Sequence, residues 1–207
     1  MKNKYFVYIG IILLIHWSLL VTDRIKYEIP LNLLWISHLA LLTSAIGFIL
    51  RSNLILTASL ISIFIMHGLW IIDFVFLLLG NSPSTYTEYV LRLTPERRIL
   101  TFHHIYLIPL LFWALLKQRK INKHGWIIAS IFFLILSTMS FYFLPREYNI
   151  NCAHFVCIPI TKILPSFAIS NTLNQFIYLI LLNLFMALFI FYLPYKVIYY
   201  IFKKFNK

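Results

Sequence analysis

Residues 53–80 read NLILTASLISIFIMHGLWIIDFVFLLLG, and this stretch decides the fold. It is long and apolar enough to cross a bilayer as a helix. It nevertheless places His67 and Asp73 inside the crossing. An ionisable side chain in hydrocarbon is costly unless it is paired or hydrated, so both residues mark a candidate functional site.

The composition of the whole chain is that of a membrane protein. Of its 207 residues, 61% are hydrophobic and only 12% are charged, and apolar runs of about 20 residues recur, as in membrane-spanning helices. We therefore expect an all-α polytopic membrane helix bundle that forms one transmembrane domain over residues 1–207. No length is left for a separate soluble domain.

The apolar runs predict six membrane spans, separated by short polar segments. Pro109 predicts a kink in the fourth span, and Pro194 is expected to bend or end the sixth. Aromatic and basic side chains after it predict a tail, residues 195–207, that lies along the membrane surface. The predicted spans are 5–21, 31–50, 54–79, 99–116, 125–144 and 172–193.

The charge distribution gives the expected orientation and partners. The formal net charge is +12, and the Lys and Arg residues lie in short loops and at the ends of the chain. Eleven of them fall on the side of the termini and seven on the other side, which favours cytoplasmic termini. No basic motif accompanies the charge, so we expect membrane lipids as partners and no nucleic acid. The sequence does not identify a protein partner.

Histidines gather at one depth of the predicted bundle. Counting 1.5 Å per residue, His38 and Asp73 lie roughly 10 Å below the outer surface and His67 lies near the midplane. His104 lies in the first turns of the fourth span, and only His124 falls on the cytoplasmic side. The agreement in depth predicts a polar cavity that opens outward, with the third span as one wall.

Two other membrane histidines have a simpler interpretation. His16 and His103 lie close to span ends, where a single imidazole commonly hydrogen-bonds a backbone carbonyl. His67 and Asp73 are six residues apart and so do not share a helix face. Each of these two therefore needs a partner from a neighbouring span.

Such a set supports several chemistries. His67 or His104 can act as a general base that takes a proton from water or from a hydroxyl such as that of Thr43. Asp73 would orient this histidine, and His38 lies nearby. A proton relay in a transporter also uses membrane Asp and His residues. A zinc site needs at least three ligands, and neither HExxH nor HxxxH spacing is present. We therefore expect no metal or other cofactor, with a divalent ion such as zinc as the alternative.

The outer segment 145–171 carries both cysteines of the chain, Cys152 and Cys157. On an oxidising face of the membrane they would form a disulfide that braces this segment. Two free thiols are the alternative.

Three stretches resemble an uncharacterised family of bacterial multi-pass membrane proteins. HGLWIIDF at 67–74 matches a His…Trp-x-x-Asp-Phe pattern, FHHIYLIPLLFW at 102–113 continues it, and PREYNIN at 145–151 matches a Pro…Asn-x-Asn pattern. The resemblance implies the bacterial inner membrane as the location. It also adds Trp70, Asn149 and Asn151 to the candidate residues, as substrate-binding groups. The chain departs from the family at 152–155, CAHF, where a Trp and Gly-rich run is common.

A more distant likeness is to six-span lipid-ester hydrolases and acyltransferases that pair a Thr with a membrane His. Thr43 and His104 would be the equivalent residues here. The sequence thus favours a lipid-active membrane enzyme. A proton- or ion-coupled small transporter and a non-catalytic subunit of a membrane complex remain the alternatives.

Overall fold

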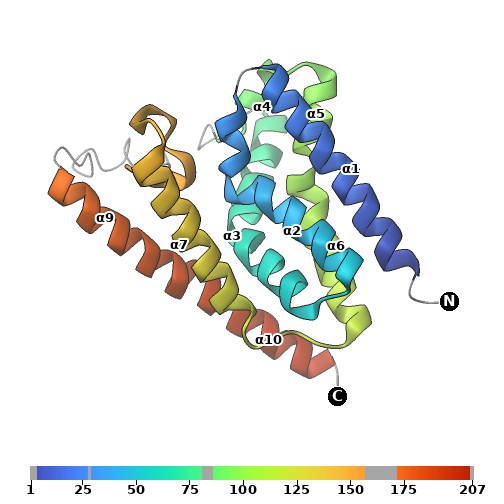
Figure 1. Ribbon diagram of the computed structural model, residues 1–207. Helices are drawn as coiled ribbons and strands as arrows, with labels where there is room; N and C mark the ends of the chain where they lie inside the picture. Colours follow the sequence, from blue (N-terminus) through green and yellow to red (C-terminus); the bar gives the residue numbers. More distant parts are fainter. Residues whose placement is uncertain (1–3, 28, 81–85, 157–171, 206–207) are drawn as a thin grey trace.

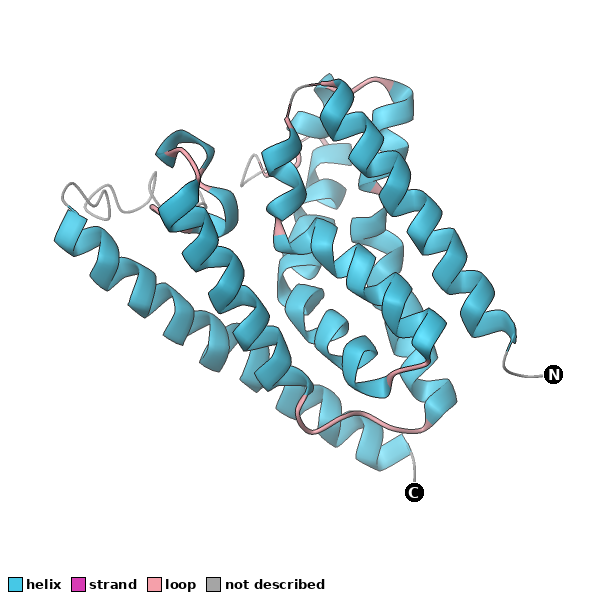
Figure 2. Cartoon of the chain, viewed as in Figure 1, coloured by secondary structure: helices cyan, strands magenta, loops and turns pink. Residues whose placement is uncertain are grey.

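The computed structural model describes residues 4–27, 29–80, 86–156 and 172–205, and these residues form helices and no strand (Figures 1 and 2). The expected all-α helical membrane bundle is therefore confirmed. Five helical segments are long and apolar enough to cross a membrane, and α2 is a shorter apolar helix. The helices are α1 (Lys4–Lys26), α2 (Ile36–Leu50), α3 (Asn53–Leu78), α4 (Tyr89–Arg92), α5 (Pro95–Thr101), α6 (His103–Gln118), α7 (Gly125–Phe143), α9 (Thr172–Phe185) and α10 (Leu193–Phe205).

The helix α3 lies at the centre of the bundle. It contacts α2, α6 and α7 along its length and α10 near its start. The helix α1 covers α2 on one side of the molecule, and α7 and α9 form the other side (Figure 1). Most of the buried apolar side chains in the core come from α2, α3 and α6.

The start of α3 follows from a tight reversal after α2. Arg51 takes the left-handed conformation (φ 54°), and the Ser52 N–H then donates to the Gly47 carbonyl, which closes the end of α2. The Ser52 hydroxyl accepts from the Ile55 N–H and caps α3. Two helices are thereby joined side by side by a single short turn.

Several helix boundaries differ from the sequence prediction. The first span was expected to end at residue 21, but α1 continues to Lys26. The second span was expected from residue 31, but Pro30–Leu34 forms a 3₁₀ turn and α2 begins only at Ile36. The sixth span was expected to bend or end at Pro194, yet the chain stays helical to Phe205. A π-helical segment, Met186–Tyr192, directly precedes the proline. In a regular α-helix the proline ring would clash with the carbonyl four residues before it, and the wider π-helical turn accommodates the ring.

The continuation of this helix also changes the expected role of the tail. Residues 195–207 were expected to lie along the membrane surface. In α10 the side chains of Tyr195, Ile198 and Phe202 are buried, and the Phe202 ring contacts that of Phe112 on α6. One face of α10 therefore belongs to the core, and the lysines near its end lie on the exposed face.

The contact between α1 and α2 depends on a glycine. A Cβ atom at Gly10 would lie 2.6 Å from Ile49 Cγ1 and 2.9 Å from the Ala45 carbonyl oxygen. Small residues allow such close approach of helices inside a membrane. By contrast, a Cβ at Gly68 on α3 would meet no atom within 4 Å.

We predict that Gly10→Ala destabilises the protein by about 1–3 kcal/mol, because the added methyl group must push α1 away from α2. Gly68→Ala is the matched control, and it should be neutral or stabilising by up to about 1 kcal/mol. Thermal unfolding in detergent micelles measures both. Equal melting temperatures for the two variants would contradict the close contact.

Candidate functional site

Three imidazole rings meet where the start of α6 packs against the middle of α3. The ring centroids of His67 and His104 are 4.5 Å apart, and those of His103 and His104 are 4.1 Å apart. One ring nitrogen from each of the three lies within 4.8 Å of the others. The three side chains are 8% exposed or less, so this histidine cluster (His67, His103 and His104) lies inside the protein.

The junction between α5 and α6 places two adjacent histidines in the same space. The chain turns at Phe102, whose carbonyl accepts from the N–H groups of both Ile105 and Tyr106. The carbonyls just before the turn accept from the rings instead. His103 Nδ1–H donates to Leu100 at 2.8 Å, and His104 Nδ1–H donates to Thr101 at 2.9 Å. Both rings are thereby held with Nε2 as the nitrogen that carries the lone pair.

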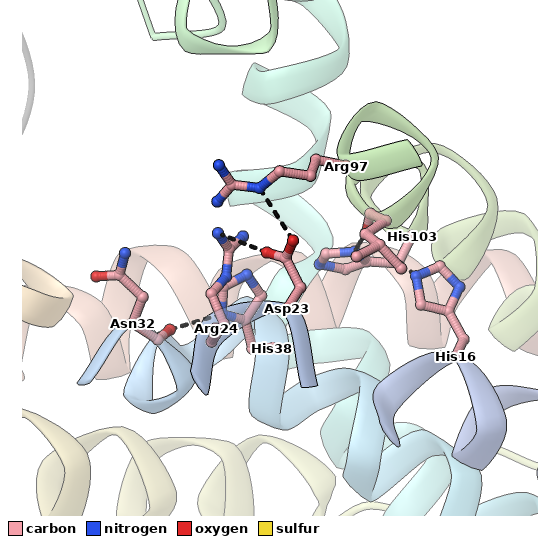
Figure 3. A network of polar contacts seen from close by, with 8 residues as sticks. His16, Asp23, Arg24, Asn32, His38, Arg97 and His103 are labelled. Atoms are coloured by element: carbon pink, nitrogen blue, oxygen red, sulfur yellow. Dashed lines mark hydrogen bonds and ion pairs between the residues drawn. The ribbon is translucent and has the colours of Figure 1, made fainter. Parts of the chain in front are cut away.

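His16 and His38 lie beside the cluster and are held by hydrogen bonds (Figure 3). His16 Nε2–H donates to the Leu100 carbonyl, and its Nδ1 accepts from the Tyr106 hydroxyl at 2.9 Å. His38 Nδ1–H donates to the Asn32 carbonyl at 2.6 Å. The rings of both histidines lie within 6 Å of the His103 ring, centroid to centroid.

The cluster itself is short of hydrogen-bond partners. Within the described part of the chain, neither ring nitrogen of His67 has a partner, and His103 Nε2 has none. Both side chains are only 1% exposed. A buried polar atom without a partner costs about 1–3 kcal/mol, so three of them at one point are an unusual concentration of unfavourable free energy.

Trp70 and Asp73 are buried side chains of α3 that follow His67 along the helix. The Trp70 ring stacks on His104, with centroids 4.8 Å apart, and its Nε1–H donates to the Tyr89 hydroxyl. Asp73 Oδ2 accepts from both the backbone N–H and the hydroxyl of Thr87, at 2.9 and 2.7 Å. The carboxylate thus ties α3 to the segment that leads into α4.

The two predicted asparagines hold the 146–155 segment in place. Asn149 takes the left-handed conformation, and its Oδ1 accepts from the N–H groups of His154 and Phe155. Asn151 Oδ1 accepts from the Ile36 N–H, the first of α2, and its Nδ2 donates to Leu34. Both amides therefore bind backbone, and Asn151 joins this segment to the start of the helix that carries His38.

A cavity of about 50 Å³ reaches the cluster between the two sides of the bundle. His67 and His104 form part of its wall. Tyr86, just outside α3, also borders it, and burial raises the pKa of this phenol to about 12, so its hydroxyl stays protonated at neutral pH. The volume is enough for one or two water molecules or a small reacting group. The rest of the wall is mostly apolar and consists of Trp35, Ile36, Ser37, Met66, Phe133, Asn151, Cys152, Leu182 and Met186.

Thr43 lies elsewhere in the bundle. Its hydroxyl pairs with Ser59 Oγ at 2.9 Å and contacts the Ala40 carbonyl at 3.2 Å. The cavity that Thr43 and Ser59 line, of about 210 Å³, has no histidine in its wall among the described residues. The structure therefore does not bring Thr43 to His104, although both are candidates from the sequence.

An ion-pair group of Asp23, Arg24 and Arg97 lies beside His38 (Figure 3). Arg97 Nε–H donates to Asp23 Oδ1 at 3.0 Å, and Arg24 Nη1 lies 3.5 Å from Asp23 Oδ2. The Arg97 guanidinium also covers the Tyr27 ring at 3.9 Å. This group links the end of α1 to α5 and carries one excess positive charge near the cluster.

The structure thus brings together His67, His104 and His38 and adds His103, which the sequence reasoning had set aside. No spacing rule indicated His103, because neighbouring residues of a regular helix point about 100° apart. Asp73 and Trp70 lie on the same helix as His67 and support the site from one side. Cys152 is disulfide-bonded, and Cys157, its expected partner, lies outside the described residues.

Comparison of the chain with protein-family models, with curated proteins and with solved structures found no match.

We predict that Asp73→Ala lowers the stability of the protein by about 1–3 kcal/mol, because two buried donors of Thr87 lose their acceptor. Asp73→Asn keeps an acceptor oxygen and should lose less. Hydrogen exchange of residues 87–92 and thermal unfolding measure the effect. Wild-type protection of α4 in Asp73→Ala would contradict the role of this carboxylate.

Proposed function

We propose that the protein is a multi-pass membrane enzyme that acts on an ester or acyl group of a membrane lipid. The observation that carries the proposal is the cavity that reaches His67 and His104 from between the two sides of the bundle. Nitrogen lone pairs at the wall of a mostly apolar cavity suit a reaction in which water must be activated beside a hydrophobic substrate.

The size of the cavity limits what enters it. About 50 Å³ holds a reacting group and a water molecule, whereas the acyl chains of a lipid are far larger. The chains would therefore stay among the apolar side chains that line its outer part, such as Leu182 and Met186. An acyl ester meets these conditions, since its carbonyl is small and its chains are apolar.

The hydrolysis of such an ester needs only water and the site. Water, deprotonated at the histidine cluster, attacks the acyl carbon, and the bond to the alcohol oxygen breaks. The proton passes to the leaving alcohol, so the products are a fatty acid and the freed hydroxyl of the lipid. An acyltransferase follows the same steps with a second lipid hydroxyl in the place of water.

The proposal includes a location and an orientation. We infer six spans, with both termini in the cytoplasm of a bacterial cell and the histidine cluster toward the outer side. The bias of Lys and Arg, eleven against seven, supports this orientation. The start of α1 and the end of α10 also lie at the opposite end of the bundle from α4 and α5 (Figure 1).

A topology test follows from this orientation. Alkaline phosphatase fused after Phe143 should be active outside the cytoplasm, and green fluorescent protein fused after Phe205 should fluoresce inside it. The positive-inside bias is the physical reason for both results. The reverse pair of signals would overturn the orientation.

Activity is tested with the purified protein in lipid nanodiscs made from bacterial membrane lipids. We expect release of fatty acids or transfer of acyl groups, detected by mass spectrometry. His67→Ala and His104→Ala should slow the rate by about 100-fold or more, because the groups that activate water are lost. His124→Ala changes an exposed loop histidine and is the matched control, which should keep the wild-type rate.

Two outcomes would contradict the proposal. One is wild-type protein that leaves every lipid class unchanged. The other is turnover that persists in His67→Ala and His104→Ala at the rate of His124→Ala. A pH-dependent ion flux into vesicles without any lipid product would favour the transporter alternative.

A further inference from the structure

We propose that the histidine cluster is a binding site for a divalent transition-metal ion, with His67, His103 and His104 as the three protein ligands. Zinc is the ion whose chemistry fits best, because it takes imidazole nitrogen in tetrahedral sites. The binding of the ion stands apart from the proposed function, since it involves no substrate.

The distances in the cluster come close to those of a zinc site. Zinc binds imidazole nitrogen at about 2.0–2.1 Å, which puts the ligand nitrogens of a tetrahedral site roughly 3.3 Å apart. The three nitrogens here lie within 4.8 Å of one another. Small rotations of the rings, which move a nitrogen by roughly 1 Å, close the difference.

The hydrogen bonds prepare the rings for metal binding. A histidine ligand ordinarily donates its second N–H to a carbonyl or carboxylate, which fixes the ring and the tautomer. His103 and His104 do so through Nδ1–H to Leu100 and Thr101, so each presents Nε2 as a lone pair. The turn at Phe102 therefore builds two ligands from two consecutive residues.

The missing partners point to the same conclusion. His67 is 1% exposed and, in the described chain, neither of its ring nitrogens has a hydrogen-bond partner. His103 Nε2 is likewise buried without one. Hydrogen bonds among the described residues therefore leave these nitrogens unsatisfied, whereas a cation between the rings would satisfy one lone pair of each.

The cavity provides the fourth position. It is bordered by His67 and His104, two of the three proposed ligands. Three imidazoles and one open position is a donor set that catalytic zinc uses, with a water molecule as the fourth ligand. Such a water has a pKa of about 7 on zinc, far below that of free water. In this respect the inference rests on the proposed function, because the ion would then be the group that activates water for attack on the ester.

Metal binding is tested on the full-length protein in detergent, stripped with a chelator and dialysed against zinc. Elemental analysis should find one zinc per chain in the wild type and in His124→Ala. His67→Ala, His103→Ala and His104→Ala should each bind at least 10-fold more weakly, because each loses one of three ligands. Wild-type protein that binds no more zinc than these variants overturns the proposal.

Cobalt and a cysteine variant keep the test decisive if alanine variants fail to fold. Co²⁺ in the wild type should show the strong visible absorption of a tetrahedral nitrogen site. His67→Cys replaces one ligand by a thiolate, so it should retain the ion and add a sulfur-to-cobalt charge-transfer band. The absence of tetrahedral bands in the wild type, or of the charge-transfer band in His67→Cys, contradicts the site.

The two proposals fail in different ways. Zinc binding without lipid turnover would contradict the proposed function and support the metal site. Lipid turnover by protein that binds no zinc removes the metal site and keeps the enzyme, with the histidines as general bases.

Discussion

Inside a membrane every buried polar atom must find its partner within the protein, because hydrocarbon offers none. Most of the polar side chains at the histidine end of this bundle follow that constraint. Asp73 binds Thr87, Asn151 binds the first turn of α2, and His16 lies between Leu100 and Tyr106. These bonds join parts of the chain that are far apart in sequence. Isolated exceptions such as Arg24 Nε and His154 Nε2 occur, but three buried nitrogens without a partner among the described residues lie together on His67 and His103.

The all-α fold and the proximity of His38, His67 and His104 were predictable, because both depend on local composition and on the rise of a helix. The positions of His67, His104 and His38 along their predicted spans indicate a common site. His103 does not, since its place depends on the turn at Phe102, which shifts the hydrogen bonds of the helix by one residue. The residues around Phe102 include no proline or glycine, so the sequence does not predict the turn.

The partners of the predicted polar residues were harder to predict than the residues themselves. Asp73 was expected to need a partner from a neighbouring span, and its Oδ2 binds Thr87, fourteen residues further along the chain. Asn151 was expected above the site as a substrate-binding group; it borders the cavity, and its Oδ1 also accepts from the first N–H of α2, which the sequence did not indicate. Thr43 was expected to pair with His104, but its hydroxyl pairs with Ser59 Oγ instead. In each case a tertiary contact determines the partner of the side chain. The pattern of residues along a single helix does not predict that contact.

The central claim is that three imidazoles from α3 and α6 surround one ion. X-ray absorption at the zinc edge of the loaded protein measures this most directly, because it reports the number and type of atoms bound to the metal. We expect three imidazole nitrogens at about 2.0–2.1 Å, recognised by the outer-shell scattering of the rings, and one water oxygen in the fourth position. A spectrum without imidazole scattering would contradict it.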